Sequence, residues 1–239
     1  MMEPEPEPER ELWLGAGGRL EVAAGAIDEA QRLGEAELTP TLVKRGEREP
    51  WHADELAMRR VLLERLERRE GWSAADSAAL DSTLMLQAIR GFHHEAQRVE
   101  TTYEKYSRIL DWRRSIGADT LLCEPPPETA RRHAKWRQQW HMDAYGEDSL
   151  GHPIMGHRLG KIDPTTFLDN FDVDLVKLCY ARDMEYFAYR KQASARQRGE
   201  TVYKQVVILD MDGLSAGHFG SKFRGPVKDV IVLLQDMYP

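Results

Sequence analysis

An apolar stripe at helical spacing dominates the middle of the sequence. Its members follow one another at alternating intervals of four and three residues: Phe92, Ala96, Val99, Tyr103, Tyr106 and Leu110. This spacing places all of them on one face of an α-helix, which must therefore pack against neighbouring elements. Gly117 is a natural stop signal, because glycine adopts the left-handed conformation that ends many helices. The sequence thus predicts a long helix over about 92–117 within a helical layer.

Two more helices are predicted before this one. Residues 52–69 lack glycine and proline and place leucines near helical spacing among charged residues, as in an amphipathic surface helix. Residues 74–90 follow Ser73, which stands three positions before Asp76 in a variant of the capping-box spacing. The first half of the chain is therefore expected to be helical throughout.

The pattern changes after Tyr145 to short apolar runs separated by turns. Residues 154–159 and 203–210 favour strands, while helices are predicted over about 128–142, 170–196 and from Pro226 onward. Because residues 206–209 are all apolar, that strand is expected inside a sheet with both faces covered. The order indicates an all-helical N-terminal subdomain followed by an α/β domain, α+β overall.

Composition excludes several classes of protein. The net charge of −7 argues against a broad basic surface for nucleic acid. Cys123 and Cys179 lack the spacing of a disulfide framework or a zinc site, which favours a reducing compartment. No apolar run approaches the roughly 20 residues of a membrane-spanning helix. Residues 1–50 begin with Glu-Pro repeats and are predicted to form a disordered or weakly structured tail.

Several short strings resemble, in the right order, those of the CRAL-TRIO lipid-binding family. They cover residues 80–239, and their order is more specific than any one string. The matches are 80–91 with "LDD-TLLRFLRA", 110–114 with a helix ending in W-R-R, 148–153 with "D-x-x-G-R-P", 158–164 with "R-L-G-K-V-D-P", 208–213 with "I-x-D-x-x-G", and 238–239 with "Y-P". His152 stands where that family usually has arginine. Trp112 and the two arginines after it are predicted to be structural, closing the third helix.

The resemblance implies a division into a helical subdomain, 51–125, and a CRAL-TRIO lipid-binding domain, 126–239. Such proteins hold one hydrophobic molecule, for example a phospholipid, between a sheet floor and a helical gate. They need no catalytic residue, metal or cofactor. The resemblance further implies a cytoplasmic monomer that contacts membrane surfaces transiently and binds no nucleic acid.

In that family more strands and the gate helix follow the "Y-P" string, so the lipid-binding domain is expected to be incomplete here, with a sheet of two or at most three strands and an apolar side uncovered. We therefore expect residues 1–239 alone to be poorly soluble or to bind a hydrophobic dye strongly. We also expect them not to carry lipid between vesicles, and an extension past Pro239 to restore both properties.

Pocket walls are expected from the helix 170–196, the strand 206–209 and the last helix, although each residue could instead face an ordinary core. The candidate ligand-binding residues are Leu175, Tyr180, Met184, Phe187, Val207, Leu209, Asp229 and Leu233. Asp229 would correspond to an acidic headgroup residue of the phosphatidylinositol-transfer branch. That branch has Arg-Lys where this chain has Phe92 and His93, and threonine where it has Val207.

Two other functional classes stay open. The run Val206–Gly213 is similar to the first motif of haloacid-dehalogenase phosphatases, in which Asp210 would attack phosphorus, Asp212 would act as acid and base, and Mg²⁺ would offset the charge. Leu214 stands where that motif has threonine, and the remaining 26 residues leave little room for its other acidic and basic groups. The second class is a helical interaction protein whose α/β half serves as a scaffold.

Two clusters that could suggest ligands are better explained structurally. His93, His94 and Glu95 are adjacent and cannot share one helix face, so solvated side chains are expected there. The basic residues 131–137 are interleaved with Trp136 and Trp140, which favours a solvated helix face covering two buried tryptophans.

Overall fold

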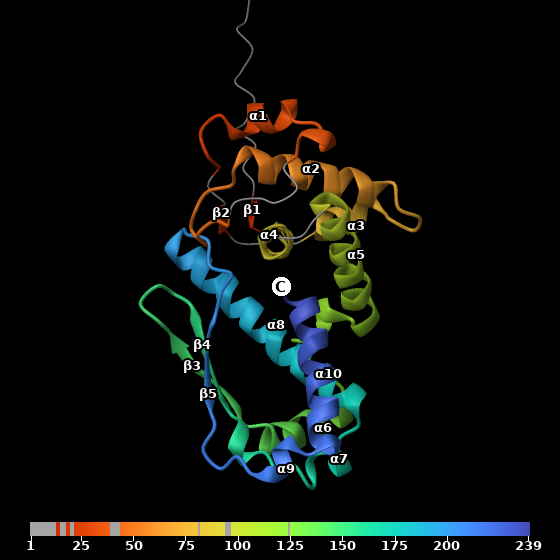
Figure 1. Ribbon diagram of the computed structural model, residues 1–239, viewed down its shortest axis with the longest axis vertical. Helices are drawn as coiled ribbons and strands as arrows, with labels where there is room; N and C mark the ends of the chain where they lie inside the picture. The colour runs from red at the N-terminus through yellow and green to blue at the C-terminus, as the bar shows by residue number, and fades with distance from the viewer. Residues whose placement is uncertain are drawn as a thin grey trace, which may run out of the picture.

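The computed structural model of this chain describes residues 13–14, 18–19, 22–38, 44–80, 82–93, 97–123 and 125–239. The N-terminal part contains β1 (Trp13–Leu14), β2 (Gly18–Arg19), α1 (Ala26–Arg32), η2 (Glu35–Glu37), α2 (Ala53–Glu67), α3 (Ala74–Ala79), α4 (Ser82–Gly91), α5 (Arg98–Ile116) and η3 (Ala118–Thr120). The C-terminal part contains α6 (Pro127–Gln139), β3 (Met142–Glu147), β4 (Pro153–Arg158), η4 (Leu159–Lys161), α7 (Phe167–Asn170), α8 (Val173–Arg198), β5 (Val206–Asp210), α9 (Ala216–Phe219) and α10 (Ser221–Met237). Figure 1 shows the first group at one end of the molecule and the sheet β3–β5 with its helices at the other. The expected α+β organisation, helices first and then an α/β part, is confirmed.

Capping and stop residues in the sequence predicted most helix ends correctly. The Ser73 hydroxyl accepts a hydrogen bond from the Asp76 amide at 3.2 Å, and the Asp76 carboxylate accepts one from the Ser73 amide at 2.8 Å. Gly117 ends α5 at a φ of 62°, in the left-handed region expected of it. Two boundaries differ from the prediction. The helix predicted over 74–90 is divided into α3 and α4 by the extended backbone of Leu80, and α5 begins at Arg98, after the turn at Phe92–His93.

Part of the segment predicted to be weakly structured is folded onto the helical layer. Ala26 and Ala30 of α1 are buried against α2, and Trp51 is 1% exposed. The Ala23 amide donates to the Trp51 carbonyl at 2.9 Å, which ties the two segments together. Lys44 and Arg45, which precede Trp51 in the chain, line a pocket between the two halves of the molecule.

The sheet has the strand order β3-β4-β5 among the described residues. β3 runs antiparallel to β4, with Met142 opposite His157, and β4 runs parallel to β5, with Ile154 opposite Val206. Helix α8 forms the crossover between the two parallel strands (Figure 1). Strand β3 was not predicted, because its sequence mixes polar residues and glycine.

In the described part of the chain the sheet has three strands and leaves an apolar side uncovered, as expected for residues 1–239 alone; an interior position of residues 206–209, which would need a further strand beside β5, stays a prediction. β5 is an edge strand that pairs with β4, and the side chains of Val207, Ile208 and Leu209 are 45%, 52% and 54% exposed. Apolar composition was therefore a good guide to the strand itself. These exposed side chains leave an apolar surface on β5.

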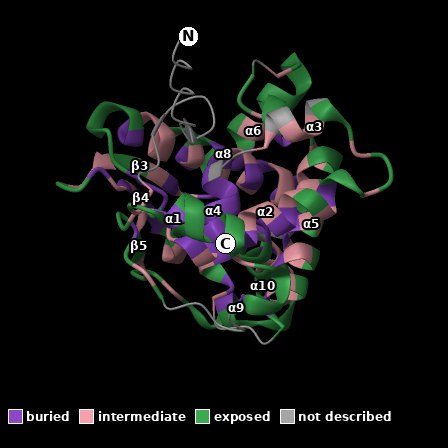
Figure 2. Ribbon diagram, turned by 90° about the horizontal axis from the view of Figure 1, so that it is seen from above, coloured by how far each residue is buried: buried purple, intermediate pink, exposed green. Residues whose placement is uncertain are grey.

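Two hydrophobic cores support the molecule, and Figure 2 shows their buried residues along the centre of the ribbon. The helical core is formed mainly by α2, α4 and α5 and includes Met58, Leu62, Leu66, Leu86, Ile89, Tyr106 and Ile109. The α/β core lies between α6, α7, α8, α10 and the sheet and includes Trp136, Trp140, Met155, Phe167, Phe171 and Val176. Trp112 and Tyr238 pack against both cores, with their rings edge to face at 5.7 Å. Trp112 therefore has the structural role predicted for it. Among the described residues, no helix is both long and apolar enough to cross a membrane.

A buried ion pair holds these cores together at the end of the chain. Arg113 of α5 donates to both carboxylate oxygens of Glu185 on α8, at 2.6 and 3.2 Å, and the Tyr238 hydroxyl donates to Glu185 at 2.8 Å. Burial alone would lower the pKa of Arg113, but the hydrogen bonds and the charge of Glu185 outweigh it and raise the pKa. We call these three residues the junction.

Replacing Arg113 by methionine should destabilise the protein strongly, because the Glu185 carboxylate would be left buried beside Tyr238 without its cation. We expect a loss of about 3–5 kcal/mol in the free energy of unfolding, measured by urea denaturation. The matched control is Arg114→Met on the same helix, since Arg114 is 56% exposed and pairs with Asp76 at the surface. That variant should lose no more than about 1 kcal/mol. Equal losses in the two variants would contradict the role of the junction.

Candidate functional site

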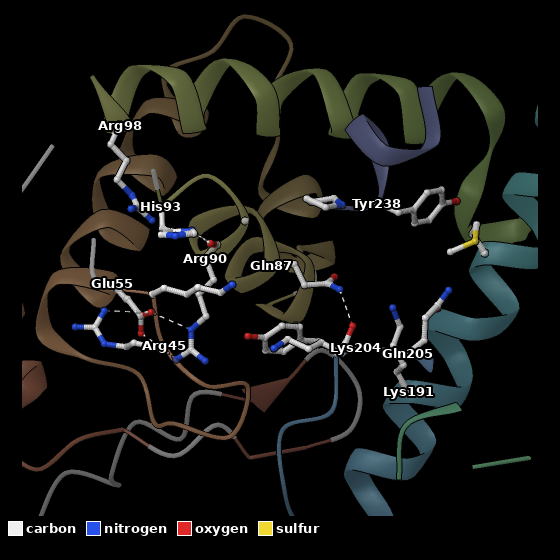
Figure 3. A pocket seen from close by; sticks show the side chains of 15 residues that line it. Arg45, Glu55, Gln87, Arg90, His93, Arg98, Lys191, Lys204, Gln205 and Tyr238 are labelled. Carbon is white, nitrogen blue, oxygen red and sulfur yellow. Dashed lines mark hydrogen bonds and ion pairs between the residues drawn. The ribbon is translucent and has the colours of Figure 1, made fainter. Parts of the chain in front are cut away.

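A pocket of about 540 Å³ lies where the two halves of the molecule meet. It is bordered by α4, the start of α5, α8, the segment before β5 and the last two residues (Figure 3). Among the described residues that line it, six are lysine or arginine and one is a carboxylate. The charged residues are Lys44, Arg45, Arg90, Arg98, Lys191, Lys204 and Glu55. We call it the basic pocket.

Arg98 is the most unusual residue of the basic pocket. It lies in the buried stripe of α5, together with Thr102, Tyr106 and Ile109, and is 1% exposed. One guanidinium nitrogen donates to the Ile89 carbonyl at the end of α4, whereas Nε and Nη1 have no hydrogen-bond partner within the described part of the chain. Burial lowers the pKa of Arg98 to about 10, against the opposing charges of Asp54 and Glu55. A buried cation with unpaired donors is costly, so this position favours an anion beside it.

Glu55 pairs with two of the other cations, and one of these, Arg45, also pairs with Asp54 at 3.1 Å. Its carboxylate, 1% exposed, accepts hydrogen bonds from Arg90 at 2.9 and 3.1 Å and pairs with Arg45 at 3.4 Å. Arg90 also donates to backbone carbonyls of residues 46, 47, 49 and 50. Its main role is thus to hold the segment 44–50 against α4, and the excess positive charge comes from the remaining cations.

Figure 3 shows how these side chains are arranged. In this view Arg98, His93, Arg45 and Glu55 lie on one side, and Lys204, Gln205 and Lys191 lie on the other. The Gln87 amide donates to the Tyr203 carbonyl at 3.0 Å and so fixes the segment before β5 against α4. His93 is held through Nδ1, 2.9 Å from the Arg90 carbonyl. This arrangement can surround a phosphate, because guanidinium groups offer paired donors and lysines add charge.

A second pocket, of about 550 Å³, lies between α6, α8 and β3. Its centre is Asp183, whose pKa is raised to about 6 by burial although Arg137 and the Trp136 indole oppose this shift. Burial and then Arg182 and Arg137 lower the pKa of His133 to about 4. Acidic and basic groups occur together here, so the second pocket shows no charge excess comparable with that of the basic pocket.

The described structure does not gather the candidate residues predicted from the sequence into one cavity. Met184 lines the basic pocket and Phe187 lines the second pocket, while Leu175 and Tyr180 belong to the α/β core. Val207 and Leu209 are exposed on β5, Asp229 is exposed on α10, and Leu233 is half-buried against the helical core.

Sequence reasoning missed the cations of the basic pocket. Lys44 and Lys204 lie far apart in the chain, and nothing in the sequence indicates that they meet. Arg98 could have been found, because it begins the buried series of α5, where a charged residue is unexpected. Of the histidine cluster, His93 lines the pocket, whereas His94 and Glu95 lie outside the described residues.

Asp210 and Asp212 occupy a turn that has a structural explanation. Asp210 accepts a hydrogen bond from the Asp212 amide at 2.9 Å, and Asp212 pairs with Lys161 at 3.2 Å, with its side chain 82% exposed. The turn packs so closely on Gly160 that a Cβ there would lie 1.9 Å from the Asp212 carbonyl oxygen. Within the described residues, no group of three or more potential metal ligands is found. The geometry therefore gives no support to phosphatase chemistry at this motif.

Comparison with known proteins finds a modest sequence similarity over part of the chain. No family model matches the chain. The chain is 27% identical over 146 residues to a protein of Arabidopsis thaliana named phosphatidylinositol/phosphatidylcholine transfer protein SFH12. The match covers 59% of this chain and 26% of that protein, so it spans about a quarter of the length of the relative. This similarity points in the same direction as the CRAL-TRIO resemblance of the sequence strings.

Replacing Arg98 by methionine should test whether its buried charge serves stability or binding. If the charge is kept for a ligand, the unliganded Arg98→Met variant should remain within about 1 kcal/mol of the parent or become more stable, because a buried unpaired ion is removed. Arg108→Met is the control, since Arg108 is on the same helix and is 64% exposed. Urea denaturation measures both. A loss above about 3 kcal/mol in Arg98→Met alone would show that Arg98 mainly holds the end of α4.

Proposed function

We propose that the chain binds a phospholipid as part of a protein that transfers it between membranes, with the phosphate of the headgroup in the basic pocket. The observation that carries this proposal is the buried Arg98 guanidinium, with two unpaired nitrogens in a pocket rich in lysine and arginine. A lipid phosphate would accept hydrogen bonds from these nitrogens and offset the charge. The relative from Arabidopsis thaliana is named as a transfer protein, which supports lipid binding as the class of activity.

The exposed apolar side chains supply the second requirement of such a ligand. Lipid taken from a bilayer needs apolar contacts to replace those it leaves. β5 and the residue that follows it expose Val207, Ile208, Leu209 and Met211, and α10 exposes Ile231 and Val232. We propose that these surfaces contribute to the contacts with the acyl chains, with Val207 and Leu209 in the role expected from the sequence.

This function requires no covalent step. The CRAL-TRIO membership that the sequence strings suggest implies binding and release, and the relative is named for transfer rather than catalysis. We therefore propose a protein that visits membrane surfaces transiently. The net charge of −7 makes the basic pocket a local exception that would attract anionic headgroups.

Lipid recovery from the purified chain should test the proposal. After incubation with vesicles of phosphatidylcholine containing phosphatidylinositol, the chain is separated from the vesicles, and its bound lipid is extracted and measured by mass spectrometry. We expect about one phospholipid per chain, enriched in the anionic species relative to the vesicles. Arg98→Met should lose this enrichment by roughly tenfold, because it removes a charge-assisted hydrogen-bonding group.

Arg108→Met, in which an exposed arginine of the same helix is replaced, should retain the behaviour of the parent. If the parent recovers no phospholipid from these vesicles, the lipid-binding proposal is wrong. Stable recovery of a protein partner in place of lipid would favour the scaffold alternative.

A further inference from the structure

His152, the residue that stands in place of the usual arginine of the turn motif, lies between two carboxylates. It belongs to the turn between β3 and β4, where its Nδ1 is 2.9 Å from Asp148 Oδ2 and its Nε2 is 2.7 Å from Glu47 Oε2. A neutral imidazole carries one N–H and can donate to one of these oxygens. Only the imidazolium can donate to both. The geometry therefore favours the protonated form of His152.

Glu47 connects this histidine to the basic pocket. Its carboxylate is 7% exposed, and Oε1 accepts hydrogen bonds from the backbone amides of Tyr203 and Lys204. Tyr203 and Lys204 line the basic pocket, as do Lys44 and Arg45, which belong to the same segment as Glu47. The turn, the segment 44–50 and the segment before β5 are thus joined through one carboxylate.

Other charged groups also face the turn and the segment beside it. Arg48 donates to the Leu150 carbonyl at 2.6 Å and pairs with Glu200, and Arg198 donates to the Ser149 carbonyl at 3.2 Å. Hydrogen bonds from His152 lower the pKa of Asp148. His52 lies 4.0 Å from Glu49 on the same segment and is the other nearby histidine among the described residues. Histidine is the side chain whose charge changes between about pH 5 and pH 8.

We propose that His152 forms a proton-controlled clasp on the basic pocket. When protonated, it ties Glu47 to the turn and so holds Lys44, Arg45 and Lys204 in the arrangement that binds an anionic headgroup. When it loses its proton, one of the two carboxylate contacts is lost, Glu47 loosens, and the affinity of the pocket for the anion falls. This regulation rests on the proposed lipid-binding function, whereas the clasp itself can be measured without any ligand.

The direction of the effect follows from the contacts. Burial would lower the pKa of His152, but the hydrogen bonds to Asp148 and Glu47, together with their charges, raise it above the ordinary value. A group with a raised pKa stabilises the folded state fully below its ordinary pKa of about 6.5, and this contribution is lost as the pH rises through the raised value. The clasp is therefore closed below about pH 6.5 and opens as the pH rises through the raised pKa of His152.

Hydrogen exchange of the unliganded chain tests the clasp directly. The variants are His152→Arg, which restores the usual residue of the turn motif and keeps a permanent charge, and His152→Gln, which is neutral at every pH. Exchange of residues 148–152 and 203–204 is compared between variants at the same pH, at about 6 and about 8. We expect the parent to match His152→Arg at the lower pH and to approach the faster exchange of His152→Gln at the higher pH. His52→Gln, the control on the same segment, should follow the parent.

Binding to phosphatidylcholine vesicles that contain phosphatidylinositol tests the link to function. From about pH 6 to about pH 8 the affinity of the parent should fall roughly fivefold to tenfold, as expected for the loss of one charged hydrogen bond. His152→Arg should show a much smaller fall, and His152→Gln should bind weakly at both pH values. His52→Gln, which replaces a nearby histidine that does not line the pocket, is the control, and its affinity should fall as that of the parent does.

The two experiments separate the two proposals. Absence of vesicle binding at any pH would contradict the lipid-binding function, and with it the regulation, while the exchange data would still decide the clasp. Identical exchange of the parent and His152→Arg at both pH values would overturn the clasp. If the affinity of His152→Arg falls as steeply as that of the parent, the titrating group lies elsewhere and the inference is wrong.

Discussion

The ion pair between Arg113 and Glu185, joined by the Tyr238 hydroxyl, is the interaction on which the rest of the structure depends. It lies between the helical core and the α/β core, so the relative placement of α5, α8 and the end of α10 follows from it. Removing two charges from water is costly, and the pair is stable only because the carboxylate is also satisfied by Tyr238. The pair holds Tyr238, and with it Pro239, in the wall of the basic pocket. The stability of the molecule and the shape of its pocket therefore share one cause.

The basic pocket lies between the helical part and the α/β part of the molecule, and each of its walls comes from a different part of the chain. α4 and α5 contribute buried donors, the segment 44–50 contributes cations held by Glu55, and α8 and the segment before β5 complete the opposite side. A fold selected for stability alone would place apolar residues at Arg98, on the buried face of a helix. Local conflict of this kind is commonly retained where a protein binds a ligand. An anion in the pocket would accept hydrogen bonds from Arg98 and offset its buried charge.

The sequence predicted the parts of the fold that depend on local rules. Helix ends such as Ser73 and Gly117, and the general order of helices and strands, follow from capping and periodicity, and the structure agrees with them. Strand β3 was missed because pairing with β4, rather than composition, forms it. The small sheet with an uncovered apolar side was expected, since the sequence offers few strands and residues 206–209 are all apolar. The basic pocket could not be predicted, apart from Arg98, because residues such as Lys44 and Lys204 meet only through tertiary packing.

The exposed apolar side chains of β5 are unfavourable in water and favour association with another apolar surface. An edge strand with uncovered apolar side chains tends to associate with other chains, and proteins usually limit this with charges or a covering element. Lys204 before β5 and Asp210 at its end are the nearest charges, and the residues between 206 and 209 carry none. An amphipathic ligand would account for both features, because its charged end satisfies donors such as those of Arg98 and its chains cover apolar side chains.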